Sequence, residues 1–370
     1  MRLTEEQEAL RSAVRALLAR HEGAAAWRPL TEQIGVAGLL VPEEYGGAGC
    51  GAREAAVVLE ELGRALSPAP YLGSAVVAVR ALLTSGDTAA CARLLPGIAD
   101  GTAVASLAWA EGGSWDPVAV RGRAAPHADG SWRITAAKEH VLDGADADVV
   151  LVAARTEAGV SLFEVTARDA GLRREALVTM DQTRSLARLA LDGAEGRLIG
   201  ADGDGTRVLA HVLDHACTAL AAEQVGAAEH CLERTVAYAG QRVQFGRPIG
   251  SFQAVKHRLA DAYVLVESAR STALGAAVAA ATDSPDLTRC AAAAKSACSE
   301  AFAAVAGEMI QLHGGIGITW EADAHRYFKR AHGAAQLFGP PAWHRGRLLA
   351  DLGLTAVPAG PPAVGGASLG

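Results

Sequence analysis

The chain has 370 residues, a formal net charge of -7 at pH 7 and a sequence pI near 5.9. Half of the residues are hydrophobic and 20% are charged, a balance that is typical of a globular protein with a large core and that excludes a disordered chain. The acidic balance also excludes a broadly basic surface of the kind that binds nucleic acid or an anionic membrane, so we expect neither as a partner. A local basic pocket is still compatible with this composition.

Targeting and redox signals point to a cytoplasmic protein. Residues 1–20 are charged throughout and lack the apolar core of a signal peptide, and charges interrupt the Ala-rich stretches, so we expect no membrane span. The six cysteines form no C-x-x-C pair and have no His at zinc-finger spacing. We therefore expect buried, reduced thiols and no metal site.

The first part of the chain favours helices. Apolar residues recur at helical spacing over 3–20 and 52–66, and 75–95 is a third helical stretch. A Gly-rich loop, Pro42 to Gly49, lies between the first two. This pattern predicts an N-terminal helical domain over residues 1–102.

Near residue 103 the pattern changes to alternating apolar and polar residues. Asp129-Gly130 predicts a β-hairpin, Asp143-Gly144 predicts another turn, and Val149 to Ala153 is suited to a buried strand. A last strand is predicted to end before Asp192-Gly193. Residues 103–203 are therefore predicted to form a compact β domain.

The third region is helical again. Residues 206–241, 251–282 and 286–312 are long Ala- and Leu-rich periodic stretches with short links, a pattern that favours an antiparallel bundle over 204–354. The Pro- and Gly-rich residues 355–370 are predicted to be a flexible tail.

Two stretches carry the chemistry. Residues 241–253 include Arg242, which can pair with a phosphate, and Phe245, which can stack on a base. Residues 311–321 contain three glycines, which let a backbone approach a ligand closely. Taken singly, each is also an ordinary connection after a helix. Neither is a G-x-G-x-x-G after a strand, so a Rossmann nucleotide site is not indicated.

These two stretches, together with Pro42 to Gly49, Glu60 to Gly63 and Met180 to Arg184, resemble the acyl-CoA dehydrogenase family in order and separation. The resemblance covers nearly the whole chain. It implies an α+β fold: an N-terminal α-helical domain, a β-barrel-like middle domain and a C-terminal four-helix bundle. It also implies a tetramer that binds FAD at subunit interfaces, dehydrogenates an acyl-CoA thioester in lipid metabolism and passes electrons to an acceptor such as an electron-transfer flavoprotein.

The resemblance also assigns cofactor contacts. Arg242 matches the family Arg that reaches the FAD pyrophosphate of a neighbouring subunit, and Phe245 matches the ring beside the adenine. The remaining contacts lie on the adenosine part, in the glycine-rich turn and at the flavin: Gln253, Gln311, Gly315, Ser114, Val141 and Leu142. His140 and Leu142 replace a family Trp and Thr, so we expect backbone contacts to the flavin to survive there and side-chain contacts to differ.

The dehydrogenation needs a carboxylate that removes a proton beside the polarised thioester carbonyl. By the resemblance, the two positions that carry this Glu in the family are Phe338 and Ala216, and neither residue can take a proton. Asp214, His215 and Glu223 are the nearest possible substitutes, although a structural role is the better interpretation of each. No catalytic residue is therefore assigned.

Three functions stay open. The preferred hypothesis is a base-lacking subunit of a heteromeric acyl-CoA dehydrogenase whose partner is a Glu-bearing paralogue. One alternative is a homomeric dehydrogenase with an unconventional base. The other is a flavin monooxygenase or oxidase on the same fold, or a scaffold that binds no flavin, because a fold does not fix a function.

Overall fold

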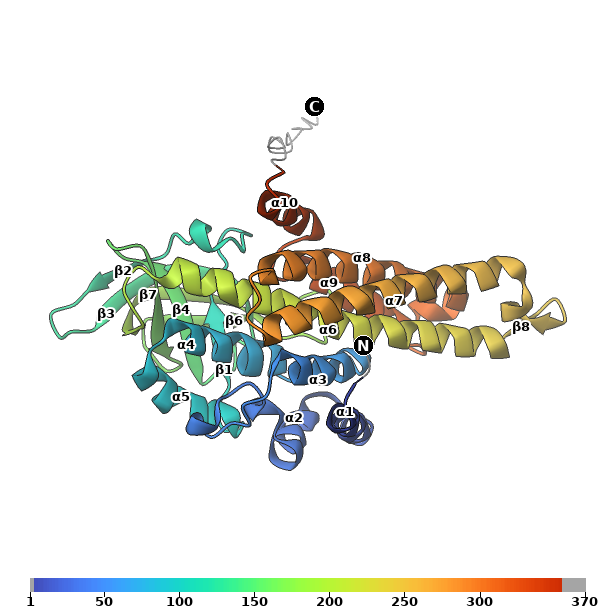
Figure 1. Ribbon diagram of the computed structural model, residues 1–370, viewed down its shortest axis with the longest axis horizontal. Helices are drawn as coiled ribbons and strands as arrows, with labels where there is room; N and C mark the ends of the chain where they lie inside the picture. The colour runs from blue at the N-terminus through green and yellow to red at the C-terminus, as the bar shows by residue number, and fades with distance from the viewer. Residues whose placement is uncertain (1–2, 355–370) are drawn as a thin grey trace.

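The computed structural model describes residues 3–354, so the predicted tail lies outside the described residues. Its first part is helical (Figure 1), with α1 (Glu5–Leu18), α2 (Trp27–Pro29), α3 (Ala52–Arg64), α4 (Val79–Ser85) and α5 (Thr88–Ala99) joined by short helical turns. Thr4 and Gln7 form a capping box at the start of α1, which explains why that helix begins there.

The prediction of a single helix over residues 75–95 is wrong. A π-helical segment over Tyr71–Ala78 leads into α4, and Gly86 then ends α4 in the left-handed conformation at φ +70°. Asp87 caps the next helix, since its carboxylate accepts a hydrogen bond from the Ala90 backbone N–H. A glycine stop followed directly by an Asp cap therefore divides a continuous apolar pattern into α4 and α5.

The middle of the chain forms one seven-stranded sheet. Its strands are β1 (Ala105–Ala108), β2 (Arg123–Pro126), β3 (Trp132–Leu142), β4 (Val149–Arg155), β5 (Val160–Thr166), β6 (Leu172–Ala176) and β7 (Leu186–Ile199). The order is β1-β4-β2-β3-β7-β5, with β6 on β7, and a further β4–β5 pairing returns the sheet to β4. The predicted hairpin at Asp129-Gly130 is confirmed as the antiparallel β2–β3 pair.

The last strand extends beyond its predicted end. Leu191 pairs with Ala136 and Ala194 with Ile134, so Asp192 and Gly193 together lie opposite one residue of β3. Gly193 has φ +64°. Asp192-Gly193 is therefore a β-bulge inside β7, where a left-handed Gly supplies the extra residue, and does not end the strand.

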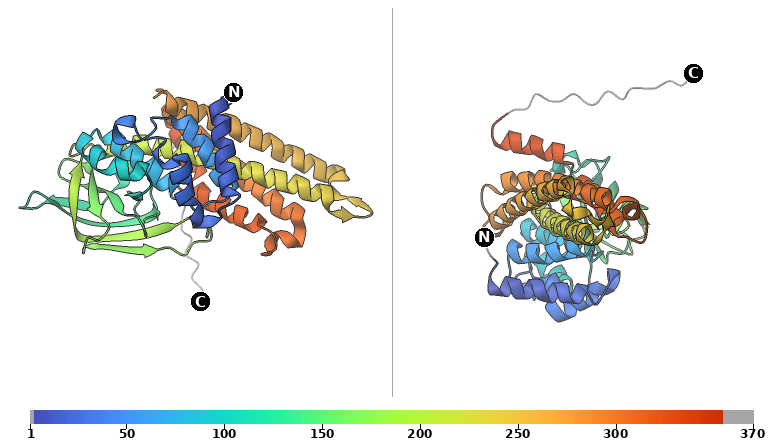
Figure 2. Two further views of the ribbon diagram at one scale, coloured as in Figure 1. Left: turned by 90° about the horizontal axis from the view of Figure 1, so that it is seen from below. Right: turned by 90° about the vertical axis from the view of Figure 1, so that its right-hand side faces the viewer.

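The C-terminal region is a helical bundle around α6 (Gly205–Gln241). Antiparallel α7 (Gln253–Ala281) and α8 (Leu287–His313) follow, then α9 (Ala324–Gln336) and α10 (Pro341–Asp351). The small hairpin of β8 (Val243–Gln244) and β9 (Arg247–Pro248) joins α6 to α7. Figures 1 and 2 show that this α6–α7 connection lies at the opposite end of the molecule from the seven-stranded sheet.

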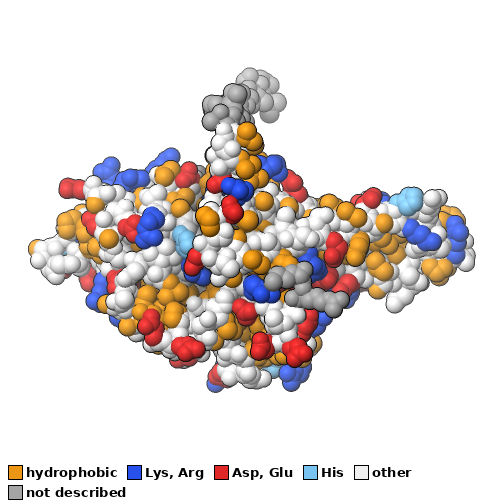
Figure 3. All heavy atoms as spheres, viewed as in Figure 1, with side chains coloured by type: hydrophobic (Ala, Val, Ile, Leu, Met, Phe, Trp, Pro, Cys, Tyr) orange, Lys and Arg blue, Asp and Glu red, His pale blue; other side chains and the backbone are white. Residues whose placement is uncertain are grey.

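Two segments, Gln253–Ala281 and Leu287–Ile318, are long and apolar enough to cross a membrane by length and composition alone. Both pack with α6 and with each other in the bundle, and core helices pass the same test, so the signal is weak. Acidic and basic side chains are interspersed over the face shown in Figure 3. The absence of a membrane partner stays a prediction.

Helices α3 and α6 approach closely at two glycines. A Cβ on Gly63 would lie 2.0 Å from the Glu223 carbonyl oxygen, and a Cβ on Gly226 would lie 1.9 Å from the Glu60 carbonyl oxygen. Only a residue without a side chain fits at these points, so the pair of glycines fixes the N-terminal domain against the bundle.

Gly226→Ala is expected to destabilise the protein by about 1–3 kcal/mol, because the added methyl forces the two helices apart. Thermal unfolding of the full chain measures the effect. The control is Gly240→Ala near the end of the same helix, where a Cβ meets nothing within 4 Å and where Ala favours the helix by up to about 1 kcal/mol. Equal melting temperatures for the two variants would contradict the close approach.

Candidate active site

A cavity of about 380 Å³ lies between the β domain and the segment that joins α9 to α10. Its lining is mostly apolar and aromatic, with one buried guanidinium: Gly113, Trp115, His140, Thr179, Met180, Asp181, Arg184, Leu186, Gly333, Gln336, Leu337 and Pro340. Its volume falls in the range of small-molecule and cofactor sites.

One wall of the cavity is the loop after β1, which a buried ion pair holds in place. Lys138 on β3 is fully buried and donates to Glu111 Oε1 at 2.5 Å. The Glu111 carboxylate also accepts hydrogen bonds from the backbone N–H groups of Arg121 and Gly122. Burial lowers the pKa of Lys138, and the Glu111 charge opposes that shift. The pair therefore fixes both ends of the loop that carries Trp115.

An aromatic cluster of Trp109, Trp115 and Phe338 adjoins the cavity, and Trp115 is the member that lines it. The Phe338 ring stacks on Trp109 at a centroid distance of 5.8 Å and meets Trp115 edge-on at 5.2 Å. Phe338 is 1% exposed, and Ala216 on α6 is fully buried in the same apolar core. Both positions that are predicted to lack the base are thus part of the apolar core.

The backbone at Phe338 is strained, with φ +60°, which a bulky residue rarely adopts. The buried His344 holds it there, since His344 Nε2 lies 2.9 Å from the Phe338 carbonyl oxygen. Burial lowers the pKa of His344 to about 3, so the ring is neutral, and donation from Nε2 leaves Nδ1 to accept from Arg347 at 3.3 Å.

The same network accounts for Asp214, the first predicted substitute for the base. One of its carboxylate oxygens accepts from Arg347 at 2.6 Å, and the other accepts from the Thr288 hydroxyl at 2.6 Å. Asp214 therefore completes a chain of contacts through Arg347 and His344 to the Phe338 carbonyl. It supports the loop from outside the cavity.

Glu223, the second substitute, lies in a buried ionic cluster beside the cavity. It accepts hydrogen bonds from Arg184 and, at 2.8 Å, from Arg330. Arg330 is 2% exposed and also contacts Asp181 at 3.0 Å and the Thr183 carbonyl oxygen at 2.7 Å. A buried carboxylate that is held by two guanidinium groups already has its partners, which suits a structural role.

The third substitute, His215, faces another part of the molecule. It is buried beside His211 and Arg80, and burial is the main cause that lowers its pKa to about 2. None of the three candidates is among the residues that line the cavity. Among the described residues, the charged side chains that line the cavity are those of Arg184 and Asp181.

The predicted cofactor residues fall into two groups. Ser114 lies in the loop after β1, and Val141 and Leu142 are buried on β3, where they pair with Ala187 and Leu186 of β7. The cavity is lined by their sequence neighbours Gly113, Trp115 and His140.

The second group lies at the distant end of the bundle. Arg242, Phe245, Gln253, Gln311 and Gly315 are all exposed, around the α6–α7 connection and the end of α8 (Figure 1). Tyr238 stacks on His313 with a centroid distance of 4.3 Å, which joins the ends of α6 and α8. The structure therefore gathers these residues at one tip and keeps them away from the chain's own cavity.

The sequence did not predict the aromatic cluster or the contacts of Arg184 and Arg330 with Glu223. Arg184 is the last residue of the stretch Met180 to Arg184, but its ionic cluster includes Arg330 of α9, which lies far along the chain. Trp109 and Trp115 are six residues apart and meet only because the loop between them turns back: the Trp109 indole donates to the Trp115 carbonyl oxygen at 3.1 Å.

Models of two domains match most of the chain: the acyl-CoA dehydrogenase N-terminal domain over residues 4–102 and the C-terminal domain over 203–352. The chain belongs to the acyl-CoA dehydrogenase family. It is 42% identical over 352 residues to the acyl-CoA dehydrogenase IpdE2 of Mycobacterium tuberculosis, covering 91% of this chain and 94% of that protein. The family relationship identifies it as an oxidoreductase of the acyl-CoA dehydrogenase type.

Two solved structures of this family are similar over nearly the whole chain. One is the steroid ACAD Tcur3481-Tcur3483, with 33% identity, a TM-score of 0.84 and coverage of 94% of this chain and 97% of that one. The other is the ChsE4-ChsE5 complex of Mycobacterium tuberculosis, with 30% identity, a TM-score of 0.87 and coverage of 96% and 99%. These matches confirm the α+β acyl-CoA dehydrogenase fold predicted from the sequence.

Asp143, beside the ionic cluster, gives a pH-dependent prediction. Burial is the main cause that raises its pKa to about 7, against about 3.9 in an unfolded chain. Between these values the unfolded state loses the proton and the folded state keeps it, so stability falls as the pH rises from about 4 to about 7 and levels off above 7. Asp143→Asn removes this penalty and is expected to stabilise the protein by about 1–4 kcal/mol above pH 7 and hardly at all below pH 4.

Thermal unfolding at both pH values checks this expectation. Asn also tolerates the left-handed backbone at this position, where φ is +55°. Asp261→Asn on the exposed side of α7 is the matched control and should leave the melting temperature nearly unchanged at either pH. A gain for Asp143→Asn that is equally large at low pH would contradict the assignment.

Proposed function

We propose that this chain is the base-lacking subunit of a heteromeric, FAD-dependent acyl-CoA dehydrogenase. The observation that carries the proposal is the buried Phe338, stacked on Trp109 at the position where the family places its catalytic Glu. A phenyl ring cannot accept the substrate proton, and the nearby carboxylates of Asp214 and Glu223 are already paired with arginines. The partner subunit would supply the Glu.

The cavity suits a flavin. Trp115, Met180 and Leu186 give it broad apolar walls, and the Arg184 Nε–H is buried without a hydrogen-bond partner among residues 3–354. An unpaired buried donor costs free energy unless a ligand acceptor meets it, so this wall fits a ring system with carbonyl and ring-nitrogen acceptors. Bound FAD supplies the acceptor for the hydride that leaves the substrate β-carbon. The residues of this chain position the ring and exclude water.

The exposed tip supports shared flavin sites. Phe245 is 92% exposed with φ +52°, and Arg242 beside it is exposed as well. An aromatic ring and a guanidinium held in solvent at the end of a long hairpin suit contacts to the adenine and pyrophosphate of FAD in another subunit. With these contacts, the chain completes a neighbour's flavin site even while its own cavity lacks a base.

Two of the similar solved structures support a heteromer over a homomer as the arrangement to test first. The names of the steroid ACAD Tcur3481-Tcur3483 and of the ChsE4-ChsE5 complex each contain two proteins. A CoA thioester carried on a steroid ring system is therefore the first substrate class to try. An electron-transfer flavoprotein is the proposed acceptor, and a dye can replace it in the assay.

The purified chain alone is expected to reduce the dye with acyl-CoA at a rate about 10²–10⁴-fold below that of the complex, because it lacks general-base catalysis. Both preparations are assayed with FAD added in excess, so that loss of cofactor does not imitate loss of the base. Turnover by the homomer at the rate of the complex would contradict the proposal and favour the homomeric alternative. A flavin-free complex would favour the scaffold.

Arg242→Ala is expected to lower the FAD content of the complex after gel filtration, because a charge-assisted Arg–phosphate contact contributes about 1.5–3 kcal/mol. The flavin-to-protein absorbance ratio measures it. Arg207→Ala is the control, since Arg207 is an exposed arginine at the other end of α6, paired with Asp204. Unchanged FAD content in Arg242→Ala would remove this residue from the flavin site.

A further inference from the structure

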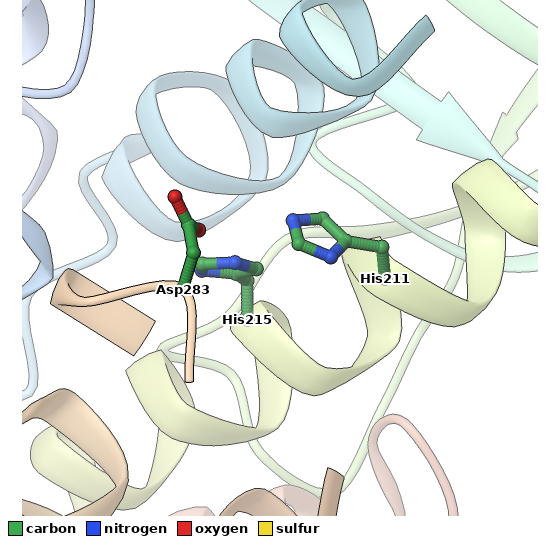
Figure 4. Close-up of side chains that lie close together, drawn as sticks. All are labelled: His211, His215 and Asp283. Atoms are coloured by element: carbon green, nitrogen blue, oxygen red, sulfur yellow. The ribbon is translucent and has the colours of Figure 1, made fainter. Parts of the chain in front are cut away.

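A second cluster of ligand-type side chains lies outside the cavity described above. His211 and His215 lie one turn apart on α6, and Asp283 comes from the connection between α7 and α8 (Figure 4). Their potential ligand atoms all lie within 4.8 Å of one another. Residues four apart on a helix share one face, so the sequence His211-Val212-Leu213-Asp214-His215 presents both imidazoles to the same space, while Asp214 between them binds Arg347.

His215 gives the cluster an independent sign of a ligand. Its side chain is 5% exposed, and its Nε2 has no hydrogen-bond partner among residues 3–354. A buried polar atom without a partner costs free energy, and such atoms in native proteins usually meet a water or an ion. In Figure 4 the two rings lie side by side on α6, and the Asp283 side chain lies next to His215.

We propose that His211, His215 and Asp283 bind a divalent transition-metal ion such as Zn²⁺. Two imidazole nitrogens and one carboxylate oxygen are a common ligand set for zinc, with water in the fourth position. Hard cations such as Mg²⁺ prefer oxygen ligands, so the two histidines favour Zn²⁺, Co²⁺ or Ni²⁺.

Protonation does not oppose binding. Burial is the largest cause that lowers the pKa of both His211 and His215, so both rings are in the neutral form that coordinates metals. Arg80, Arg207, Asp214 and Asp283 are the charged groups that act on His211.

The geometry needs one adjustment. Metal–ligand bonds of about 2.0–2.2 Å place tetrahedral ligand atoms roughly 3.3 Å apart, closer than the present limit of 4.8 Å. Asp283 is exposed, so its side chain has room to rotate toward the two rings when an ion binds. Once bound, the ion would tie the α7–α8 connection to α6, one residue from Ala216.

Because of Arg80, one variant is expected to strengthen metal binding while others weaken it. Its charge lowers the pKa of both histidines, so it disfavours any second cation at the site. Arg80→Gln is therefore expected to strengthen metal binding, whereas removal of a ligand weakens it. A nonspecific surface site would not respond in this way.

The test is Zn²⁺ titration of the tag-free, chelator-treated full chain by isothermal calorimetry, with Co²⁺ absorption as a second readout. We expect one ion per chain and Co²⁺ bands without thiolate charge transfer. Asp283→Asn and His211→Ala should each raise the Kd by more than about tenfold. Asp283 is exposed, so that variant should fold even if changes at the buried His215 disturb α6.

His257→Ala, which removes an exposed histidine of α7, is the matched control and should bind Zn²⁺ like the parent chain. Equal Kd values for the parent, Asp283→Asn and His211→Ala would overturn the proposal, as would the absence of binding to the parent chain. Thiolate bands in the Co²⁺ spectrum would assign the ion to the cysteines and would also overturn it.

Discussion

The guanidinium of Arg330 connects all three parts of the molecule. From α9 it reaches Glu223 on α6, Asp181 and Thr183 in the β domain, and the Ser67 carbonyl oxygen in the N-terminal domain. A charge that is 2% exposed is tolerated only when it is fully paired, and removal of one partner of such a pair costs about 3–5 kcal/mol. The segment over 181–184 is thereby fixed against α9, and this contact sets the shape of the cavity that Arg184 and Gly333 line.

Beside this ionic cluster, the position at which the family resemblance places the catalytic carboxylate is apolar. Phe338 keeps a strained left-handed backbone while its ring stacks on Trp109, and Asp214, Arg347 and His344 support its carbonyl group. These contacts thus support the backbone at residue 338, where the side chain is a phenyl ring that can neither donate nor accept a proton. This combination suits a subunit that keeps the shape of the site and leaves proton abstraction to a partner.

Periodicity and turn residues predicted the three-part α+β organisation and the long helices closely, because those features depend on local pattern. They failed where tertiary contacts decide. Gly86 and Asp87 divide an apolar stretch into α4 and α5, and Gly193 makes a bulge because β3 continues beside it. The ionic cluster, the aromatic cluster and the cluster of His211, His215 and Asp283 join residues far apart in the sequence, which spacing alone does not bring together.

A count of reducible flavins in the purified complex tests most directly whether this chain lacks a working base. The complex is saturated with FAD, its two chains are quantified, and the flavin absorbance is titrated with acyl-CoA under anaerobic conditions. If Phe338 leaves this chain silent and the partner supplies the Glu, at most one flavin for every two chains is bleached. Bleaching of one flavin per chain would contradict the absence of a base in this subunit.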